Sequence, residues 1–315
     1  MNERSPDSLE LGHYYRERRG IPERNLCRVS VDPSSPDIPW PEFRARVLEP
    51  VNRHIEQQGL SNQVDFIVLC KDFPSRVSDN ESVTAVLFYG FHGIPGCPPC
   101  SMPTNTRSRY FGAERAFRRA AAGAPPGFLA LLLTGSTLEE ARAVADRGVA
   151  ADGARPAGTF YLLKPPGDPA RNVRFRLFDH FDQHARLYPG FPAYEFVNDN
   201  VIAGKKDVLG FLTGVPDYPD WVWTTNVFLP GAMADHFTSF GARLPDPPID
   251  QATVMDWIRA GATASYGTVN EPCAYLEKFP NPMVYFWYGR GFCLAESYWM
   301  SVANPYQGLF VGEPL

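Results

Sequence analysis

The chain has 315 residues, of which 44% are hydrophobic and 21% are charged, an ordinary composition for a globular protein. Its net charge of −5 gives no electrostatic basis for a nucleic-acid partner, and no apolar stretch reaches the ~18 residues that a membrane helix needs. We therefore expect one α/β domain over residues 1–315, with no nucleic-acid partner and no membrane span.

The first part of the chain alternates helical and strand patterns. Ser5 followed by Pro6 predicts the start of a helix that ends at Gly20. Apolar residues at helical spacing predict a second helix over Glu42–Gln58. The continuous apolar run Val64–Cys70 predicts a strand buried on both faces, as in a parallel sheet. Further predicted strands are Asn25–Val31 and Phe128–Leu133, while Val83–Phe91 fits either a strand or a buried helical turn.

The second part repeats the order of strand and then helix. A capping box at Thr137 predicts a helix through Val149, Arg176–Leu187 is a predicted helix, and Asp250 predicts the start of another. Tyr285–Met300 is predicted as an aromatic-rich helix. The predicted strands are Thr159–Lys164, Val208–Thr213, Val222–Leu229, Ala262–Val269 and Gly308–Val311. This order is typical of parallel sheets, so we predict an α/β fold, a three-layer sandwich with a mostly parallel central sheet.

Polar residues follow several of the predicted strands. Ligands of open α/β sheets bind beyond the carboxyl ends of the strands, so we expect these residues to converge on one rim. They are Lys71 and Asp72, Ser136 and Thr137, Asp217 and Asp220, Asp235 and His236, and Glu271. The densest group of reactive side chains lies in Asn226–Pro272, and its catalytic candidates are Asp235, His236, Ser239 and Glu271.

Two interpretations stay open for these candidates. Asp235, His236 and Ser239 are the residue types of a charge-relay triad. Neighbouring residues on a helix point about 100° apart, so Asp235 and His236 cannot easily share one hydrogen-bond line. The alternative, a polar helix start that caps itself, is therefore favoured. Glu271 is the better single candidate, because a carboxylate at a strand end can act as a general base, a cation ligand or an acceptor for sugar hydroxyls. Its alternative role is a buried cap that accepts N–H bonds from the loop.

The cysteines and histidines give no clear metal or redox motif. Cys97-Pro-Pro-Cys100 lies in a proline-rich loop without the strand and helix that flank a redox motif, so a structural or incidental pair is favoured and its redox state stays open. Cys273 and Cys293 do not supply a second metal-binding pair. His180 and His184 lie one helical turn apart, but without a third ligand a solvated helix face is favoured. We expect no metal and no cofactor.

Six segments carry a resemblance to a known family. The chain resembles a prokaryotic family without an established activity that occurs in species carrying the exosortase protein-sorting system. Members start with a signal peptide and a strand before the Asn-Glu-Arg-Ser-Pro segment, and they continue past the last residues of this chain. The resemblance implies an exported or envelope protein, here without its first strand and its C-terminal continuation. The segments are Asn2–Pro22, Arg109–Phe117, Asp207–Tyr218, Leu229–Gly241, Gly261–Pro272 and Asn304–Leu315.

A more distant similarity is to caspase-like cysteine peptidases of the gingipain type. These place a His-Gly after one parallel strand and a nucleophilic cysteine after the next, which here correspond to Val208–Thr213 and Val222–Leu229. The turns that follow, Gly214-Val215 and Leu229-Pro230-Gly231, hold neither residue. A caspase-like fold is therefore expected, while the peptidase dyad does not carry over.

Two functions follow as hypotheses. The first is a hydrolase with a polar rim site at the strand ends, in which Glu271 or His236 is the base. The second is a non-catalytic envelope or surface component that binds a polysaccharide or a peptide. The aromatic group Pro216–Trp223 fits a sugar-stacking platform or, equally, a packed corner.

Overall fold

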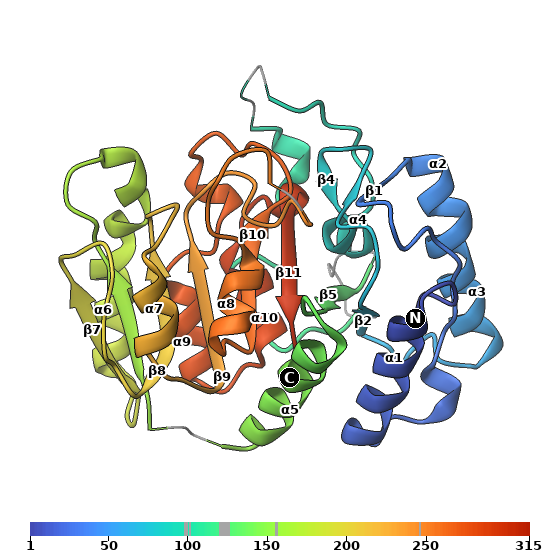
Figure 1. The fold of residues 1–315 in the computed structure, drawn as a ribbon, viewed down its shortest axis with the longest axis horizontal. Helices are drawn as coiled ribbons and strands as arrows, with labels where there is room; N and C mark the ends of the chain where they lie inside the picture. The colour runs from blue at the N-terminus through green and yellow to red at the C-terminus, as the bar shows by residue number, and fades with distance from the viewer. Residues whose placement is uncertain (98–99, 101, 120–126, 155–156, 246) are drawn as a thin grey trace.

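An eight-stranded sheet forms the centre of the molecule (Figure 1). The computed structural model describes residues 1–97, 100, 102–119, 127–154, 157–245 and 247–315. All neighbouring strands of the sheet run parallel except β10 and β11, which are antiparallel. In spatial order the strands are β2 (Phe66–Cys70), β5 (Leu129–Leu133), β11 (Gly308–Gly312), β10 (Ala264–Thr268), β9 (Phe228–His236), β8 (Val208–Thr213), β6 (Thr159–Leu163) and β7 (Ala193–Val197).

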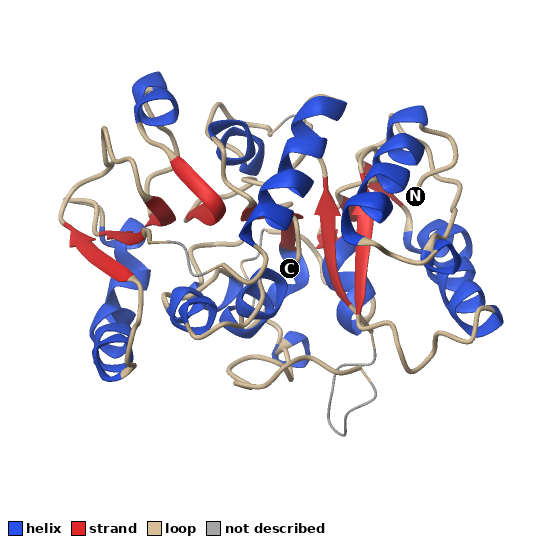
Figure 2. Cartoon of the chain, turned by 90° about the horizontal axis from the view of Figure 1, so that it is seen from below, coloured by secondary structure: helices blue, strands red, loops and turns tan. Residues whose placement is uncertain are grey.

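Helices cover both faces of this sheet (Figure 2), which confirms the predicted α/β sandwich with a mostly parallel sheet. Successive strand residues pack on opposite faces: Phe160 and Leu162 join one core cluster, whereas Tyr161 and Leu163 join another. One face carries α1 (Pro6–Arg19), α5 (Leu138–Ala151), α7 (Asp220–Thr225) and α8 (Val254–Ala260). The other carries α6 (Phe178–Leu187), α9 (Met283–Gly289) and α10 (Leu294–Ser301).

Predicted capping residues set the starts of several helices. The Ser5 side chain accepts a hydrogen bond from the Ser8 N–H at the start of α1, and Gly20 ends this helix in the left-handed conformation with φ 62°. Thr137 caps α5 as predicted. The start of α8 differs from the prediction, because its capping box is built on Thr253 and not on Asp250.

The predicted helix Glu42–Gln58 is continuous but irregular. It consists of α2 (Trp40–Phe43), a π-helical turn (Arg44–Leu48) and α3 (Glu49–Gln57). Pro50 lies at the start of α3, has no N–H and crowds the carbonyl of the preceding turn. The wider π turn accommodates this proline, so the helix continues without a break.

Helix α4 (Val83–Tyr89) lies between the starts of the neighbouring strands β5 and β11. The open choice for Val83–Phe91 is therefore decided in favour of a helix. The Ser82 and Thr84 hydroxyls donate to the Gly308 carbonyl at the start of β11. The Gly127 N–H, just before β5, donates to the Phe88 carbonyl at 3.0 Å. Because α4 fills this space, β5 and β11 share a single paired position, Leu132 with Val311.

Two predicted strands are wrong. Asn25–Val31 forms a 3₁₀ turn (Glu23–Asn25) and an extended segment with one isolated bridge, between Val29 and Asn2. Val222–Leu229 contains the end of α7, and β9 begins only at Phe228. The strand continues through Pro230 and Gly231, because Gly231 adopts φ 83° in a bulge and its N–H donates to the Thr263 hydroxyl.

The C-terminal helical prediction needs one correction. The predicted helix Tyr285–Met300 is divided into α9 and α10, since Gly291 with φ 101° ends the first and allows the chain to turn. The predicted last strand is present as β11. A small sheet that the sequence did not predict consists of β1 (Asp37–Ile38), β3 (Arg76–Val77) and β4 (Glu81–Ser82).

The reversal between β10 and β11 overturns the expectation of one common rim. Strands β2 and β5 run opposite to β8, β9 and β10, so Lys71 and Ser136 leave strands that point away from the edge where Asp235 and Glu271 lie. Strand ends therefore define two separate regions. No helix among the described residues is long and apolar enough to cross a membrane.

Candidate functional site

Strands β8, β9 and β10 end at one edge of the sheet, which we call the carboxyl edge. Asp235 and His236 are the last two residues of β9 and do not form the helix start that the sequence predicts. Neighbouring residues of a strand point to opposite faces of the sheet. The two side chains therefore have different surroundings, and they cannot share one hydrogen-bond line.

Asp235 is held in a buried ion pair. Its Oδ1 atom pairs with the Arg174 guanidinium, which also donates to the Thr213 carbonyl at the end of β8. Both side chains are about 3% exposed or less. Burial raises the pKa of Asp235, and the charge of Arg174 opposes that rise. The ion pair holds the 3₁₀ segment Pro169–Leu177, which contains Arg174, against the sheet, so its role is structural.

His236 is buried with both ring nitrogens occupied. The Trp257 indole N–H can only donate, so Nδ1 of His236 is the acceptor in this 2.8 Å bond. Nε2 therefore carries the proton and donates to the Ala252 carbonyl at 2.9 Å. Burial lowers the pKa of His236 to about 4, so the ring is neutral at pH 7. His236 has no free nitrogen with which to take a proton from a ligand.

Ser239 and Glu271 lie together, apart from the other two candidates. Both line a cavity of about 220 Å³ beside the carboxyl edge, which we call the smaller cavity. Asp168, Arg171 and Cys273 line it as well. Glu271 Oε1 accepts the Cys273 N–H at 2.7 Å, which is the capping role that the sequence left open. The structure thus brings together two of the four predicted residues and directs Asp235 and His236 into the core.

A cysteine cluster borders the smaller cavity. Cys100 and Cys273 form a disulfide, and the Cys97 sulfur lies 2.9 Å from Cys100 Sγ and 3.0 Å from Cys273 Sγ. The sequence showed the Cys97–Cys100 pair but did not connect it with Cys273, which lies 173 residues from Cys100. The position of Cys273 just after Glu271-Pro272, at a strand end, was the one signal that could have connected them.

A larger cavity of about 620 Å³ lies where β2 and β5 end, against α8. The residues after the two strands line one side, including Lys71, Asp72 and Ser136. Thr253 and Arg259 of α8 line the other. The volume is that of a small-ligand site, and its place beyond strand carboxyl ends is where ligands of α/β sheets bind.

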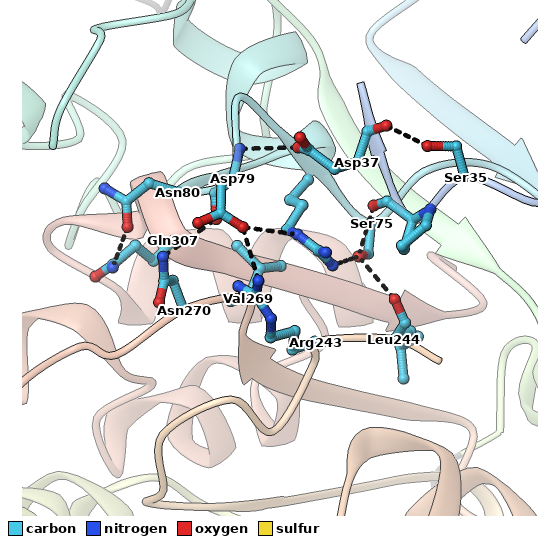
Figure 3. Close-up of polar contacts among 12 residues, drawn as sticks. Ser35, Asp37, Ser75, Asp79, Asn80, Arg243, Leu244, Val269, Asn270 and Gln307 are labelled. Atoms are coloured by element: carbon cyan, nitrogen blue, oxygen red, sulfur yellow. Dashed lines mark hydrogen bonds and ion pairs between the residues drawn. The ribbon is translucent and has the colours of Figure 1, made fainter. Parts of the chain in front are cut away.

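A polar network lies between the residues of the two cavities, and Figure 3 shows its hydrogen bonds and ion pairs. Asp79 in the turn between β3 and β4 accepts from Arg243 at 2.7 Å, and its carbonyl accepts from the Asn270 amide at 3.2 Å. The Ser75 hydroxyl donates to the carbonyl of Leu244, which lines the larger cavity. Towards the smaller cavity, the Gln307 amide donates to the Glu271 carbonyl at 3.0 Å. The small sheet therefore positions loops at both cavities.

The remaining sequence candidates have structural roles. Tyr218 and Trp223 pack edge to face against Trp257, at ring distances of 5.1 and 4.8 Å, which is the packed corner, whereas Trp221 of the same group is 42% exposed. His184 Nδ1 bonds to the His180 carbonyl at 2.8 Å. Among the described residues, the one group of histidine, cysteine and acidic side chains close enough to hold a metal ion is the cysteine cluster.

The fold and the cavities define an α/β protein whose candidate sites lie beyond strand ends. No family model, no curated protein and no solved structure matches the chain. We therefore infer function from the residues of these two cavities at strand ends and of the cysteine cluster.

Proposed function

We propose that the protein binds a neutral saccharide in the larger cavity and does not transform it. The observation that carries this proposal is the cavity of about 620 Å³ at the ends of β2 and β5, which is rich in hydroxyl groups. Ser34, Ser35, Ser75 and Thr253 donate their hydroxyl protons within the protein, so they offer a sugar hydroxyl acceptor lone pairs. Apolar surface from Phe73 and Met255 complements the sugar ring. The hydroxyl side chains are Ser34, Ser35, Ser75, Thr134, Ser136 and Thr253.

The charges in the larger cavity support a neutral ligand. Lys71 pairs with Asp72 at 2.8 Å, and Arg259 pairs with Asp256 at 2.8 Å. Arg259 also donates to the Ser136 hydroxyl at 3.0 Å. A charged ligand would have to displace one of these internal partners, whereas a neutral ligand leaves them in place. We therefore favour a saccharide over a charged peptide.

The non-catalytic part of the proposal rests on the candidates at the carboxyl edge. Asp235 is engaged by Arg174, and both nitrogens of His236 are engaged by the protein. General acid–base catalysis needs a group that can reach the proton it transfers. Neither residue lines either of the two cavities.

Isothermal titration with a panel of neutral oligosaccharides and of peptides tests this proposal. We expect binding of at least one saccharide class, with an affinity that does not change between low and high salt, because the ligand makes no ion pair. Binding of peptides alone, or an affinity that falls steeply with salt, would overturn it.

A second candidate function is hydrolysis in the smaller cavity, and one observation favours it: Ser239 and Glu271 line the same space. In this alternative Ser239 is the nucleophile and Glu271 the base, and Arg171 supplies positive charge for a developing oxyanion. Ester and glycoside substrates test it. Loss of turnover in both Ser239→Ala and Glu271→Gln supports hydrolysis, and no turnover by the parent protein removes it.

Membership in the exosortase-associated family, export to the envelope and a caspase-like arrangement of the sheet are further proposals. Their support is the set of six sequence segments together with the mostly parallel sheet. A saccharide-binding role is compatible with a place in the envelope. Localisation of the tagged protein in a native host separates an envelope protein from a cytoplasmic one.

A further inference from the structure

Three sulfur atoms meet at the rim of the smaller cavity. Cys97 Sγ lies 2.9 Å from Cys100 Sγ and 3.0 Å from Cys273 Sγ, and these last two atoms form the disulfide. Cys100 is exposed, and Cys97 and Cys273 are partly exposed. A thiolate breaks a disulfide by attacking one of its sulfurs in line with the bond. Cys97 Sγ contacts both sulfurs from the side, so its side chain has to rotate into line with the bond before it attacks.

A buried cation accompanies this cluster. Lys278 is 2% exposed, and its Nζ lies 5.3 Å from the centre of the Tyr275 ring and 5.0 Å from that of Tyr306. Burial lowers the pKa of Lys278 to about 8, and the negative charges of Cys97 and Glu271 act in the opposite direction. Lys278 is therefore a buried cation in the electrostatic neighbourhood of Cys97 and Glu271.

Metal binding is the competing use of three cysteines. Tetrahedral zinc holds each thiolate at about 2.3 Å, which places the sulfurs of two ligands about 3.8 Å apart. The Cys97 sulfur is closer than that to both neighbours, at 2.9 and 3.0 Å. The group also contains three ligand atoms among the described residues, one fewer than a structural zinc site needs. The cluster with its disulfide formed therefore differs from a closed four-ligand zinc site in both spacing and ligand number.

We propose that Cys97, Cys100 and Cys273 form a thiol–disulfide exchange site that moves a free thiol from Cys97 to Cys273. The Cys97 thiolate attacks Cys100 Sγ, a Cys97–Cys100 bond forms, the Cys100–Cys273 bond breaks, and Cys273 leaves as a thiolate. The proton that Cys97 loses and the proton that Cys273 gains balance, so the step is an isomerisation that consumes no oxidant or reductant.

The exchange changes both a cross-link and a cavity. In the Cys100–Cys273 form, the loop that contains Cys100 is tied to the segment after β10. In the Cys97–Cys100 form this tie is absent, and a free Cys273 thiol lines the smaller cavity beside Ser239 and Glu271. The site then takes thiol-reactive ligands, such as small disulfides or soft electrophiles. This inference does not depend on saccharide binding in the larger cavity.

Peptide mapping of protein purified without reductant tests the exchange. After free thiols are blocked with N-ethylmaleimide, trypsin releases Cys97 and Cys100 in one peptide, residues 77–107, and Cys273 in another, residues 260–278. We expect both forms: the two peptides cross-linked with Cys97 alkylated, and the first peptide internally bonded with Cys273 alkylated. Among the molecules that keep one disulfide, the internally bonded fraction should reach the same value from fully cross-linked and from partly reduced starting material.

Two variants make the result specific. Cys97→Ser should leave only the cross-linked pair, whereas Cys293→Ser, a partly exposed cysteine outside the cluster, should keep both forms. The proposal is overturned if Cys97 is alkylated in every molecule at every pH tested, if Cys97 bonds to Cys273 instead, or if no disulfide of either pairing is present. Stoichiometric zinc that protects all three sulfurs would also overturn it, in favour of a metal site.

Discussion

The indole N–H of Trp257 donates to Nδ1 of His236 across 2.8 Å, and this bond fixes the tautomer of a fully buried imidazole. Nε2 then donates to Ala252. The bond connects α8 to the last residue of β9, so the histidine that most resembles a catalytic residue in the sequence is part of the structural core. This relationship is the main reason to look for function in the cavities.

Buried and neutral, His236 should make stability depend on pH. Its pKa in the folded state is about 4, below the ordinary value of 6.5, so the unfolded chain takes up the proton first as the pH falls. Its contribution is complete above pH 6.5 and decreases by roughly 3 kcal/mol as the pH falls towards 4. Urea unfolding across this range measures it. His236→Gln should reduce the change of the free energy of unfolding with pH, and the exposed control His180→Gln should not. The same pH dependence in the parent and both variants would contradict a buried, neutral His236.

Removing one partner of the Asp235–Arg174 pair should lower the free energy of unfolding strongly, whereas replacing both partners with apolar residues should lower it much less. Asp235→Asn or Arg174→Met leaves one charge buried without its partner, so each should lower the free energy of unfolding by roughly 3–5 kcal/mol. The double variant Asp235→Leu/Arg174→Met should recover much of that loss. A double-mutant cycle by urea unfolding tests this, with the exposed pair Glu42–Arg46 as the control. Losses as small as those of the control would show that Arg174 does not compensate Asp235.

Local signals allowed much of the fold to be predicted. Continuous apolar runs predicted β5 and β8, because strands buried on both faces carry apolar side chains on each. The run Val64–Cys70 predicted β2 as well, but not its burial, since β2 is an edge strand and Phe66–Val68 are only half-buried. Capping residues predicted the starts of α1 and α5, because a cap is a contact between near neighbours in sequence. These features depend on a few adjacent residues.

Long-range features could not be predicted in the same way. Pro230-Gly231 has the composition of a turn, yet it lies inside β9, because pairing with β8 and the Thr263 hydroxyl stabilises a bulge there. The direction of β11 depends on the path of the chain through α9 and α10, which no local pattern records. For the site, the sequence identified Ser239 and Glu271 but separated Cys273 from its partner, because pairing across 173 residues follows from the fold.

Saccharide binding in the larger cavity is the central claim, and titration calorimetry of one cavity-filling variant tests it most directly. Met255 lines the larger cavity from α8, and Met255→Trp should fill part of the space, lowering the affinity for the bound saccharide by at least about tenfold. Leu187→Trp adds the same ring at a position that is 84% exposed and should bind like the parent protein. Unchanged saccharide affinity in a folded Met255→Trp protein would contradict the assignment of the binding site.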